Sequence, residues 1–174
     1  MKLIDILQHR RSVRKYGAED IGDEALKRIL QAGLLSASSR GKKPWEFIVV
    51  KNRKILEKMA LCRTGSANML KSAAAAVVVI ADSDITDVWI EDCSIAMSNM
   101  HLMADSMGIG SCWIQGRLRQ AADGTDTEEY LRRLLGFPEN YSLEAILSLG
   151  ISESHPEPHT LDELDMQKIH YEKY

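Results

Sequence analysis

Arginine side chains gather around a serine hydroxyl near the start of the sequence, in the segment RRSVRKY. Arg10, Arg11 and Arg14 lie within five residues of one another and enclose Ser12. The planar guanidinium group matches the oxygens of a phosphate monoester, and a serine hydroxyl adds a neutral donor that can approach closely. The segment therefore predicts a phosphate-binding site. A solvated basic surface at the end of a helix is the alternative, and motifs further along the chain must decide.

The sequence lacks the motifs of several other chemistries. It contains neither GxGxxG nor GxxxxGK, so side chains rather than a glycine-rich loop must bind the phosphate. Its five histidines have no metal-binding spacing, and its three cysteines form no CxxC pair. We therefore expect no bound metal, no disulfide and no nucleophilic triad, and we expect the cysteines to be small buried residues.

Length and charge limit the possible partners. A chain of 174 residues is long enough for one domain, residues 1–174, with a sizeable core. The net charge of −3 argues against general nucleic-acid binding, which needs a broad basic surface. The first residues hold too short an apolar stretch for a secretory signal, and no later run is long enough to cross a bilayer. We expect a cytoplasmic protein without membrane partners.

The elements that must position the arginine segment alternate between helices and strands. Leu3, Ile6 and Leu7 give a first helix one apolar face that ends before the arginines. The run AAAAVVVIAD is apolar on both faces, which indicates a central strand. Apolar periodicity predicts further helical segments over 23–35, 53–61, 67–73, 88–107 and 127–135, and strands over 45–50, 110–115 and 143–150. Few short strands among helices favour helices packed on both faces of a mixed sheet.

The remaining segment, SESHPEPH and onward, is polar. Pro156 and Pro158 keep this segment extended. We expect it to wrap around a neighbouring subunit before the final KIHYEKY docks.

Four motifs in one order indicate a family. The segments RRSVRKY, SSRGKKPWEF, EDCSIAMSNM and GIGSCWIQG follow one another in an order that resembles the nitroreductase family of flavin mononucleotide (FMN) enzymes. The resemblance covers nearly the whole chain, and the four motifs together are far more specific than any one of them. It implies an α+β fold of three layers, α/β/α, in which helices flank a mixed, mainly antiparallel sheet. It also implies a homodimer with FMN at the subunit interface.

The resemblance assigns roles to the arginine segment. Arg10, Arg11 and Ser12 would bind the FMN phosphate, and Arg14 would reach the ribityl chain or the pyrimidine edge of the ring. Reduction of the flavin places negative charge on this edge, so a guanidinium there stabilises the reduced form and raises the reduction potential.

Further cofactor contacts are implied for three other segments. In the family, the main-chain amides at the positions of Gln115 and Gly116 face N5 and O4 of the flavin. Asn68 and Lys71 resemble a polar pair that contacts the pyrimidine in some members. Lys168, in the C-terminal tail, is the candidate for an additional basic residue at the phosphate, with an ordinary exposed lysine as the alternative.

A loop from the partner subunit completes the implied site. The loop that matches Ser38 and Ser39 covers the other side of the flavin ring in the family, and Gly41 belongs to the same loop. The family commonly has amide side chains where this chain has Gly41 and Lys43. These departures remove hydrogen-bonding groups and add charge, which affects both flavin and substrate contacts.

The main hypothesis is an FMN-dependent oxidoreductase with no dedicated catalytic acid or base. It would accept hydride from NADH or NADPH and pass electrons to a nitroaromatic, quinone or related small conjugated acceptor by a ping-pong mechanism. A flavin-binding or flavin-delivery protein with little turnover is the alternative, because of the departures in the partner loop. A third hypothesis, a basic docking surface for RNA or protein, ranks below both because the net charge is negative.

Overall fold

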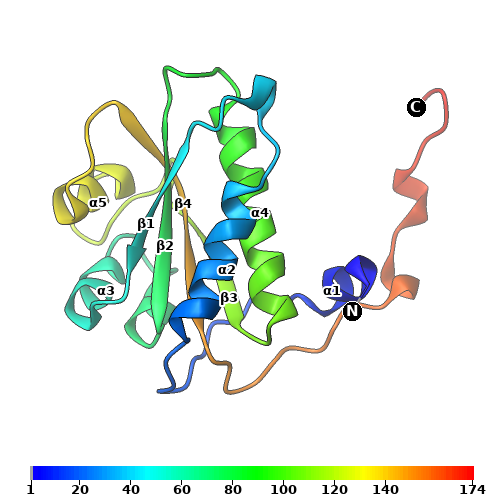
Figure 1. Cartoon of the computed structure of the whole chain (residues 1–174), viewed down its shortest axis with the longest axis horizontal. Helices are drawn as coiled ribbons and strands as arrows, with labels where there is room; N and C mark the ends of the chain where they lie inside the picture. Colours follow the sequence, from blue (N-terminus) through cyan, green and yellow to red (C-terminus); the bar gives the residue numbers. More distant parts are fainter. Residues whose placement is uncertain (1) are drawn as a thin grey trace.

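The computed structural model describes residues 2–174 and places an antiparallel sheet between two layers of helices (Figure 1). The strands follow the order β1-β2-β4-β3 across the sheet, and every neighbouring pair is antiparallel. Their bounds are Trp45–Val50 for β1, Ala75–Asp82 for β2, Gly110–Gln115 for β3 and Tyr141–Gly150 for β4. The edge strands are therefore β1 and β3.

The central strand β2 is buried on both faces. Its residues 75–81 are at most 2% exposed, and they are small or β-branched, as a strand between two layers requires. Val77 and Val79 pack in the apolar cluster on one face, whereas Val78 and Ile80 pack in the cluster on the other. Because side chains alternate along a strand, β2 contributes to both cores.

The first helical layer consists of α2 (Asp23–Leu34) and α4 (Trp89–Ser106). The long helix α4 buries small and methionine side chains against the sheet. Gly33 allows α2 to pack closely against it, because a Cβ at this position would lie 2.9 Å from the Phe47 ring and 3.0 Å from Met100. This layer covers the sheet face that Val77 and Val79 occupy.

The second layer covers the opposite face with α3 (Arg53–Met59), the 3-10 helix η2 (Asn68–Lys71) and α5 (Thr127–Leu135). Asn52 caps the start of α3 by accepting a hydrogen bond from the Ile55 N–H at 3.2 Å. The two helical layers together confirm the predicted α/β/α arrangement.

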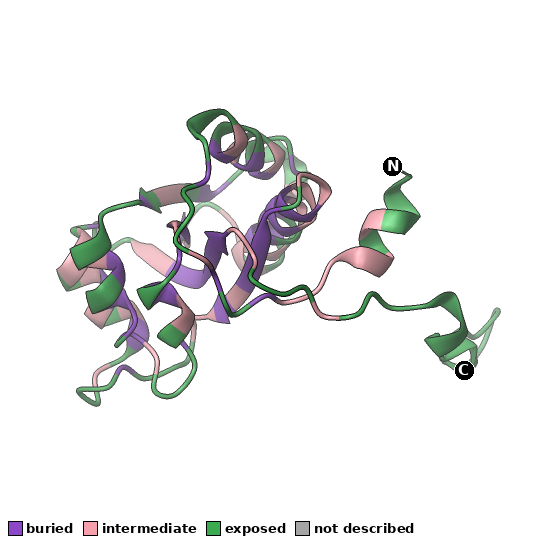
Figure 2. Cartoon of the chain, turned by 90° about the horizontal axis from the view of Figure 1, so that it is seen from below, coloured by how far each residue is buried: buried purple, intermediate pink, exposed green. Residues whose placement is uncertain are grey.

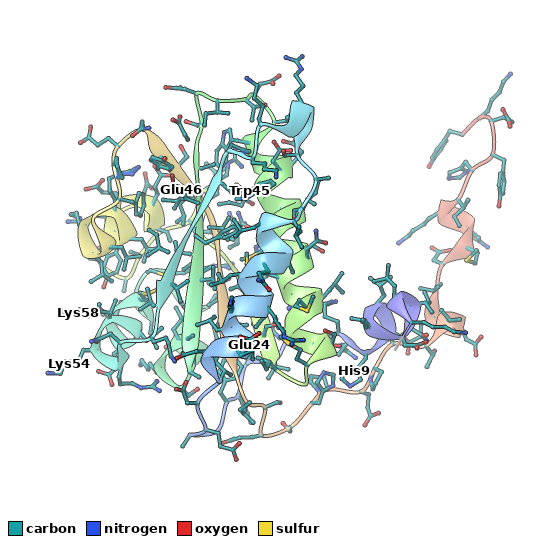
Figure 3. All side chains as sticks on the ribbon, viewed as in Figure 1. His9, Glu24, Trp45, Glu46, Lys54 and Lys58 are labelled. Carbon is teal, nitrogen blue, oxygen red and sulfur yellow. The ribbon has the colours of Figure 1, made fainter. Side chains whose placement is uncertain are left out.

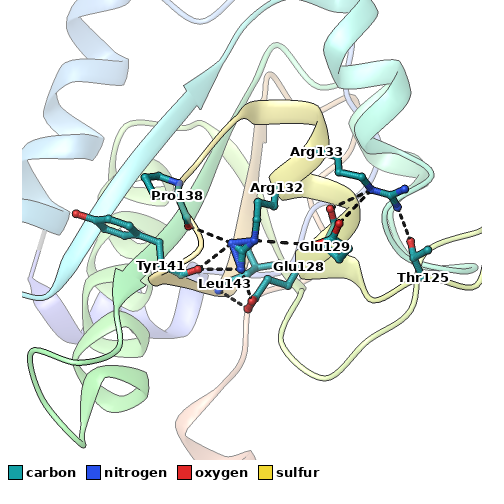
Figure 4. Close-up of polar contacts among 8 residues, drawn as sticks. All are labelled: Thr125, Glu128, Glu129, Arg132, Arg133, Pro138, Tyr141 and Leu143. Carbon is teal, nitrogen blue, oxygen red and sulfur yellow. Dashed lines mark hydrogen bonds and ion pairs between the residues drawn. The ribbon is translucent and has the colours of Figure 1, made fainter.

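Arg132 joins α5 to the start of β4 (Figure 4). Its Nη1 donates to the carbonyls of Tyr141 at 3.0 Å and Pro138 at 3.2 Å, and its Nη2 lies 2.6 Å from Oε1 of Glu128. The other carboxylate oxygen of Glu128 accepts a bond from the Leu143 N–H at 2.8 Å. The Arg132 side chain is only 16% exposed, so these charge-assisted bonds form largely away from water.

Two segments project from the three layers. α1 (Leu3–His9) contains no buried residue, and residues 152–174 contain none either (Figure 1, Figure 2). The two segments lie together, because the His159 N–H donates to the Gln8 carbonyl at 2.9 Å. Exposed apolar side chains occur on both: Leu3, Ile4, Leu7, Leu161, Leu164, Met166, Ile169, Tyr171 and Tyr174. The segment from residue 152 to the end is called the tail below.

The structure refines two predictions about the elements. The mixed character expected of the sheet is limited to one isolated parallel bridge between Ser12 and Ser111, since β1 to β4 are antiparallel throughout. Within residues 67–73 the helical part is the 3-10 helix η2, Asn68–Lys71. Among residues 2–174, no helix combines the length and apolar character that a membrane crossing requires.

The cysteines behave as predicted. Cys62, Cys93 and Cys112 are free and buried. Burial raises the pKa of the Cys62 and Cys93 thiols to about 12, so both stay protonated and unreactive at neutral pH.

Candidate active site

The arginine segment runs along the outer edge of β3. After α1 the chain becomes extended, and the Val13 N–H donates to the Ser111 carbonyl at 2.9 Å. Tyr16 anchors the end of the segment, because its buried hydroxyl lies 2.8 Å from the Val13 carbonyl and 2.7 Å from the Ser148 hydroxyl. Burial raises the pKa of this hydroxyl, which keeps it protonated as a donor. The segment is thus held by the sheet rather than free in solvent.

A buried histidine positions the first arginine. Nη1 of Arg10 lies 3.0 Å from Nε2 of His101 in α4, and Nδ1 of His101 lies 2.5 Å from the Ser111 hydroxyl. Burial, together with the nearby Arg10 charge, lowers the pKa of His101 to about 4, so the ring is neutral at pH 7. Because a guanidinium can only donate, Nε2 must accept and Nδ1 must carry the hydrogen. His101 therefore holds Arg10 in place without adding charge.

The remaining side chains of the segment differ in their surroundings. Arg11 donates to the Glu157 carbonyl of the tail through Nη1. Arg14 is exposed, and its contact with the Ser12 carbonyl is long, at 3.4 Å. Arg14 is accordingly the member of the segment whose guanidinium is most available to a ligand.

A cavity of about 400 Å³ lies beside the segment and brings Arg14 and Asn68 together. It combines a guanidinium, an amide and an indole, which suits a planar heteroaromatic ring with polar edges. Its lining residues are Arg14, Arg63, Gly65, Ser66, Asn68, Met69, Cys112 and Trp113. A second cavity of about 640 Å³ shares Arg63 and Ser66 with it. Lys71 lines neither cavity; its carbonyl accepts a bond from Arg53 at 2.7 Å.

The two amides at the end of β3 point in opposite directions. Since the Ser111 carbonyl faces the outer edge of the sheet, strand alternation turns the Gln115 main chain toward this same open edge. The Gly116 N–H instead donates to the Glu144 carbonyl of β4 at 3.2 Å. Gln115 can therefore offer a main-chain donor to a ligand on the edge, whereas the Gly116 donor is already used within the chain.

Two buried carboxylates lie close to the predicted site residues. Glu144 is the extra residue of a bulge in β4, and burial raises its pKa. Asp92, at the start of α4, accepts a bond from the Ser39 N–H at 2.8 Å. Among the described residues, Glu144 Oε2 and Asp92 Oδ2 have no partner, so each leaves an acceptor for a donor from elsewhere.

The loop that contains Ser38, Ser39 and Gly41 lies at the opposite end of the molecule from the arginine segment (Figure 1). It includes η1 (Ser39–Gly41) and is ordered by the Asp92 contact and by a bond from the Lys43 N–H to the Ser38 hydroxyl at 3.0 Å. One chain therefore does not bring this loop to the arginines.

Lys168 is also remote within one chain. It lies in η4 (Met166–Lys168), in the last part of the tail, which stands apart from the sheet (Figure 1). Sequence reasoning missed His101, Arg63 and Trp113 as neighbours of the segment. A polar residue inside the apolar stripe of the long helix was the available signal for His101, whereas the other two depend on tertiary folding.

The fold and the site define an α+β protein with an arginine-rich segment and an open cavity along one sheet edge. The family model described as "Nitroreductase family" matches residues 7–62 and 59–151, and the chain belongs to this family.

Relatives of known structure or name agree with this membership. An Archaeoglobus fulgidus protein with a provisional name as an NADH dehydrogenase/NAD(P)H nitroreductase is 36% identical over 176 residues, which cover 98% of each chain. The solved FMN-dependent nitroreductase from Clostridium difficile R20291 has a TM-score of 0.95 and 43% identity, over 98% of this chain and 99% of that one. The NADPH:FMN oxidoreductase from Vibrio harveyi, solved with NAD+, has a TM-score of 0.83 and 27% identity, over 99% and 77%.

Proposed function

We propose that the chain is an FMN-dependent NAD(P)H oxidoreductase that passes electrons by a ping-pong mechanism to nitroaromatic, quinone or related conjugated acceptors. The observation that carries this proposal is the arginine segment on the open edge of β3, which places Arg14 and Asn68 in one cavity. Family membership and relatives named for FMN and NAD(P)H support the same cofactors.

The residues along the outer edge of β3 would contact FMN from its phosphate to its ring. Arg10, Arg11 and Ser12 would bind its phosphate, and Arg10 is already aligned by neutral His101. Bound FMN supplies the hydride and electron chemistry, and the surrounding residues bind and tune it. Arg14 in the cavity would stabilise negative charge on the reduced ring.

The polar groups beside the cavity would hold the ring. The amide of Asn68 lines the cavity, and the Gln115 main chain faces the open edge, so both suit the pyrimidine and the adjoining ring atoms.

We do not extend the same donor role to Gly116, whose N–H is bonded to Glu144. A Cβ at Gly116 would lie 2.5 Å from the Leu143 side chain, so this glycine serves close packing at the end of the strand. Lys71 remains a candidate from the exposed end of η2.

A second copy of the chain would complete the site. The loop that contains Ser38, Ser39 and Gly41 lies at the opposite end of the molecule from the arginine segment, so a partner subunit would bring this loop to the flavin (Figure 1). The exposed apolar side chains of α1 and the tail offer surfaces for that association (Figure 2). We therefore infer a homodimer in which the partner's loop covers the ring and Lys168 of the tail approaches a phosphate.

An anaerobic spectrum tests the proposal. The purified protein should be yellow with bound FMN and should bleach when NADH or NADPH is added. Replacing both Arg10 and Ser12 by alanine should release FMN, because the phosphate loses its donors. The matched control replaces Lys54 and Lys58 of α3, two exposed basic residues far from α1 (Figure 3), and should keep FMN.

The outcomes separate the candidate functions. FMN that stays bound but is reduced by neither nicotinamide would instead identify a flavin-binding or delivery protein, the alternative raised by Gly41 and Lys43. A colourless protein that takes up no added FMN would overturn both.

A further inference from the structure

Three side chains from distant parts of the sequence meet at the C-terminal end of α4. They are His9 at the end of α1 (labelled in Figure 3), Asp105 in the last turn of α4, and His155 in the tail. Nδ1 of His9 lies 2.9 Å from Oδ2 of Asp105, and Nε2 of His155 lies 3.5 Å from Oδ1. The three ligand atoms lie within 4.8 Å of one another, and the two imidazole rings are stacked with centroids 4.2 Å apart.

The environment of Asp105 demands a positive partner. Its side chain is only 6% exposed, and it lies at the end of a helix where the peptide dipoles place negative potential. A buried carboxylate in this position is costly unless a cation neutralises it. Arg10 does not fill this role directly, because its guanidinium contacts His101 one turn earlier in α4. The cation must therefore be a protonated imidazole or a metal ion.

The hydrogen bonding of His155 leaves its Nε2 facing a carboxylate oxygen that needs a cation. Its Nδ1 lies 2.7 Å from the Pro156 carbonyl, which can only accept, so Nδ1 carries the hydrogen. In the neutral ring the lone pair of Nε2 then faces a carboxylate oxygen, and two acceptors oppose each other across 3.5 Å. A metal ion bound by both atoms removes this conflict, as does a second proton on the ring, and zinc titration distinguishes the two. A carbonyl contact at the other ring nitrogen is also the arrangement that orients metal-bound histidines.

We propose that His9, Asp105 and His155 bind a divalent transition metal of the zinc class. Two imidazoles and a carboxylate are the nitrogen and oxygen ligands that such ions accept. Tetrahedral bonds of about 2.1 Å separate ligand atoms by about 3.4 Å. The 3.5 Å between His155 and Asp105 Oδ1 is close to this value, whereas the 2.9 Å between His9 and Asp105 Oδ2 would have to lengthen on binding. Both imidazoles are partly exposed, at 45% for His9 and 27% for His155, so water can complete the coordination.

The bound ion would link α1, α4 and the tail, because each of these segments supplies one of its ligands. Sequence spacing gives no sign of this site, because 96 residues separate His9 from Asp105 and the third ligand lies in the tail.

Calorimetric titration of the FMN-loaded, untagged and chelator-treated protein with zinc chloride tests the proposal. The wild-type protein should bind one zinc ion per chain, and His155→Ala should weaken binding by about tenfold or more. His159→Ala is the matched control, because His159 also lies in the tail beside a carboxylate, with Glu163 at 2.9 Å. This control should bind zinc as the wild type does.

Asp105→Asn is the second variant, and it should also weaken zinc binding. Its FMN spectrum and melting temperature establish whether it is folded. Wild-type protein that takes up no zinc at roughly 100 µM would overturn the proposal and leave a protonated histidine as the partner of Asp105. Equal zinc affinity of the wild type and a folded His155→Ala variant would also overturn it.

Discussion

His101 illustrates how one buried side chain can set the geometry of an arginine-rich segment. Its neutral ring accepts from Arg10 and donates to Ser111, so it links the arginine segment to α4 and β3 without adding charge. Arg10 would keep its charge but lose its alignment if this ring were removed.

We expect His101→Ala to weaken FMN binding by roughly tenfold, equivalent to about 1.4 kcal/mol. The cause is the lost acceptor for Arg10, and His101→Gln should restore part of the affinity because its amide oxygen can accept. Quenching of flavin fluorescence measures the dissociation constants. His170→Ala, in the exposed end of the tail, is the control. Equal affinities for all four proteins would show that Arg10 needs no alignment.

The same residue makes stability depend on pH. The His101 pKa is about 4 in the folded protein and about 6.5 when unfolded, so between these values the unfolded chain binds more protons. Stability therefore falls as the pH drops from 6.5 to 4, by up to about 3 kcal/mol from this group. Urea unfolding at several pH values measures the loss, and His101→Gln should lose less over this range. Parallel curves for the two proteins would contradict the assignment.

At the scale of elements, the stability of α5 and its contacts depends more on Arg132 than on the adjacent Arg133. Arg132 is mostly buried and bonds to two carbonyls and Glu128, whereas Arg133 is 54% exposed and pairs with surface carboxylates. Buried charge-assisted bonds stabilise more than exposed ion pairs do. Arg132 and Arg133 can therefore be compared directly by mutation, because they are adjacent residues of one helix that differ in burial.

We expect Arg132→Ala to lower the free energy of unfolding by about 2 to 3 kcal/mol, because three acceptors lose their donor. Arg133→Ala should cost less than about 1 kcal/mol. Urea denaturation followed by circular dichroism compares them. Equal losses of unfolding free energy in the two variants would mean that the burial of Arg132 adds nothing to stability.

Much of the architecture could be predicted from the sequence, because periodicity and burial are local signals. The fully apolar run identified β2, the alternation of helices and strands predicted helices on both faces of the sheet, and the resemblance implied the same three layers. The bulge at Glu144, which directs its carbonyl toward Gly116, has no such signal, because it arises from the register between β2 and β4. The sequence identified the arginine segment, whereas the alignment of Arg10 by His101 required α4 to be placed in three dimensions.

At the scale of the whole molecule, the exposed tail and α1 predict association. Residues 152–174 bury no side chain within their own chain yet expose several apolar ones (Figure 2). A monomer would leave these side chains in water, so we propose that the described residues form one domain that pairs with a second copy.

We expect truncation after His155 to convert a dimer into a monomer and to lower FMN occupancy, because the tail and its Lys168 are lost. The truncated chain should still fold, since the removed residues contribute nothing to the two apolar clusters. Light scattering coupled to size-exclusion chromatography gives the mass, and removal of residues 170–174 alone is the control. A full-length chain that elutes as a monomer would refute the association.

The burial of every native thiol makes the protein convenient to label. Cys62, Cys93 and Cys112 are shielded, so a maleimide dye should leave the folded wild type unmodified. A single cysteine introduced at exposed Lys54 on α3 would then carry the only fluorophore, well away from α1 (Figure 3). Energy transfer between two such dyes would report subunit exchange in real time, without removal of any natural residue from the core.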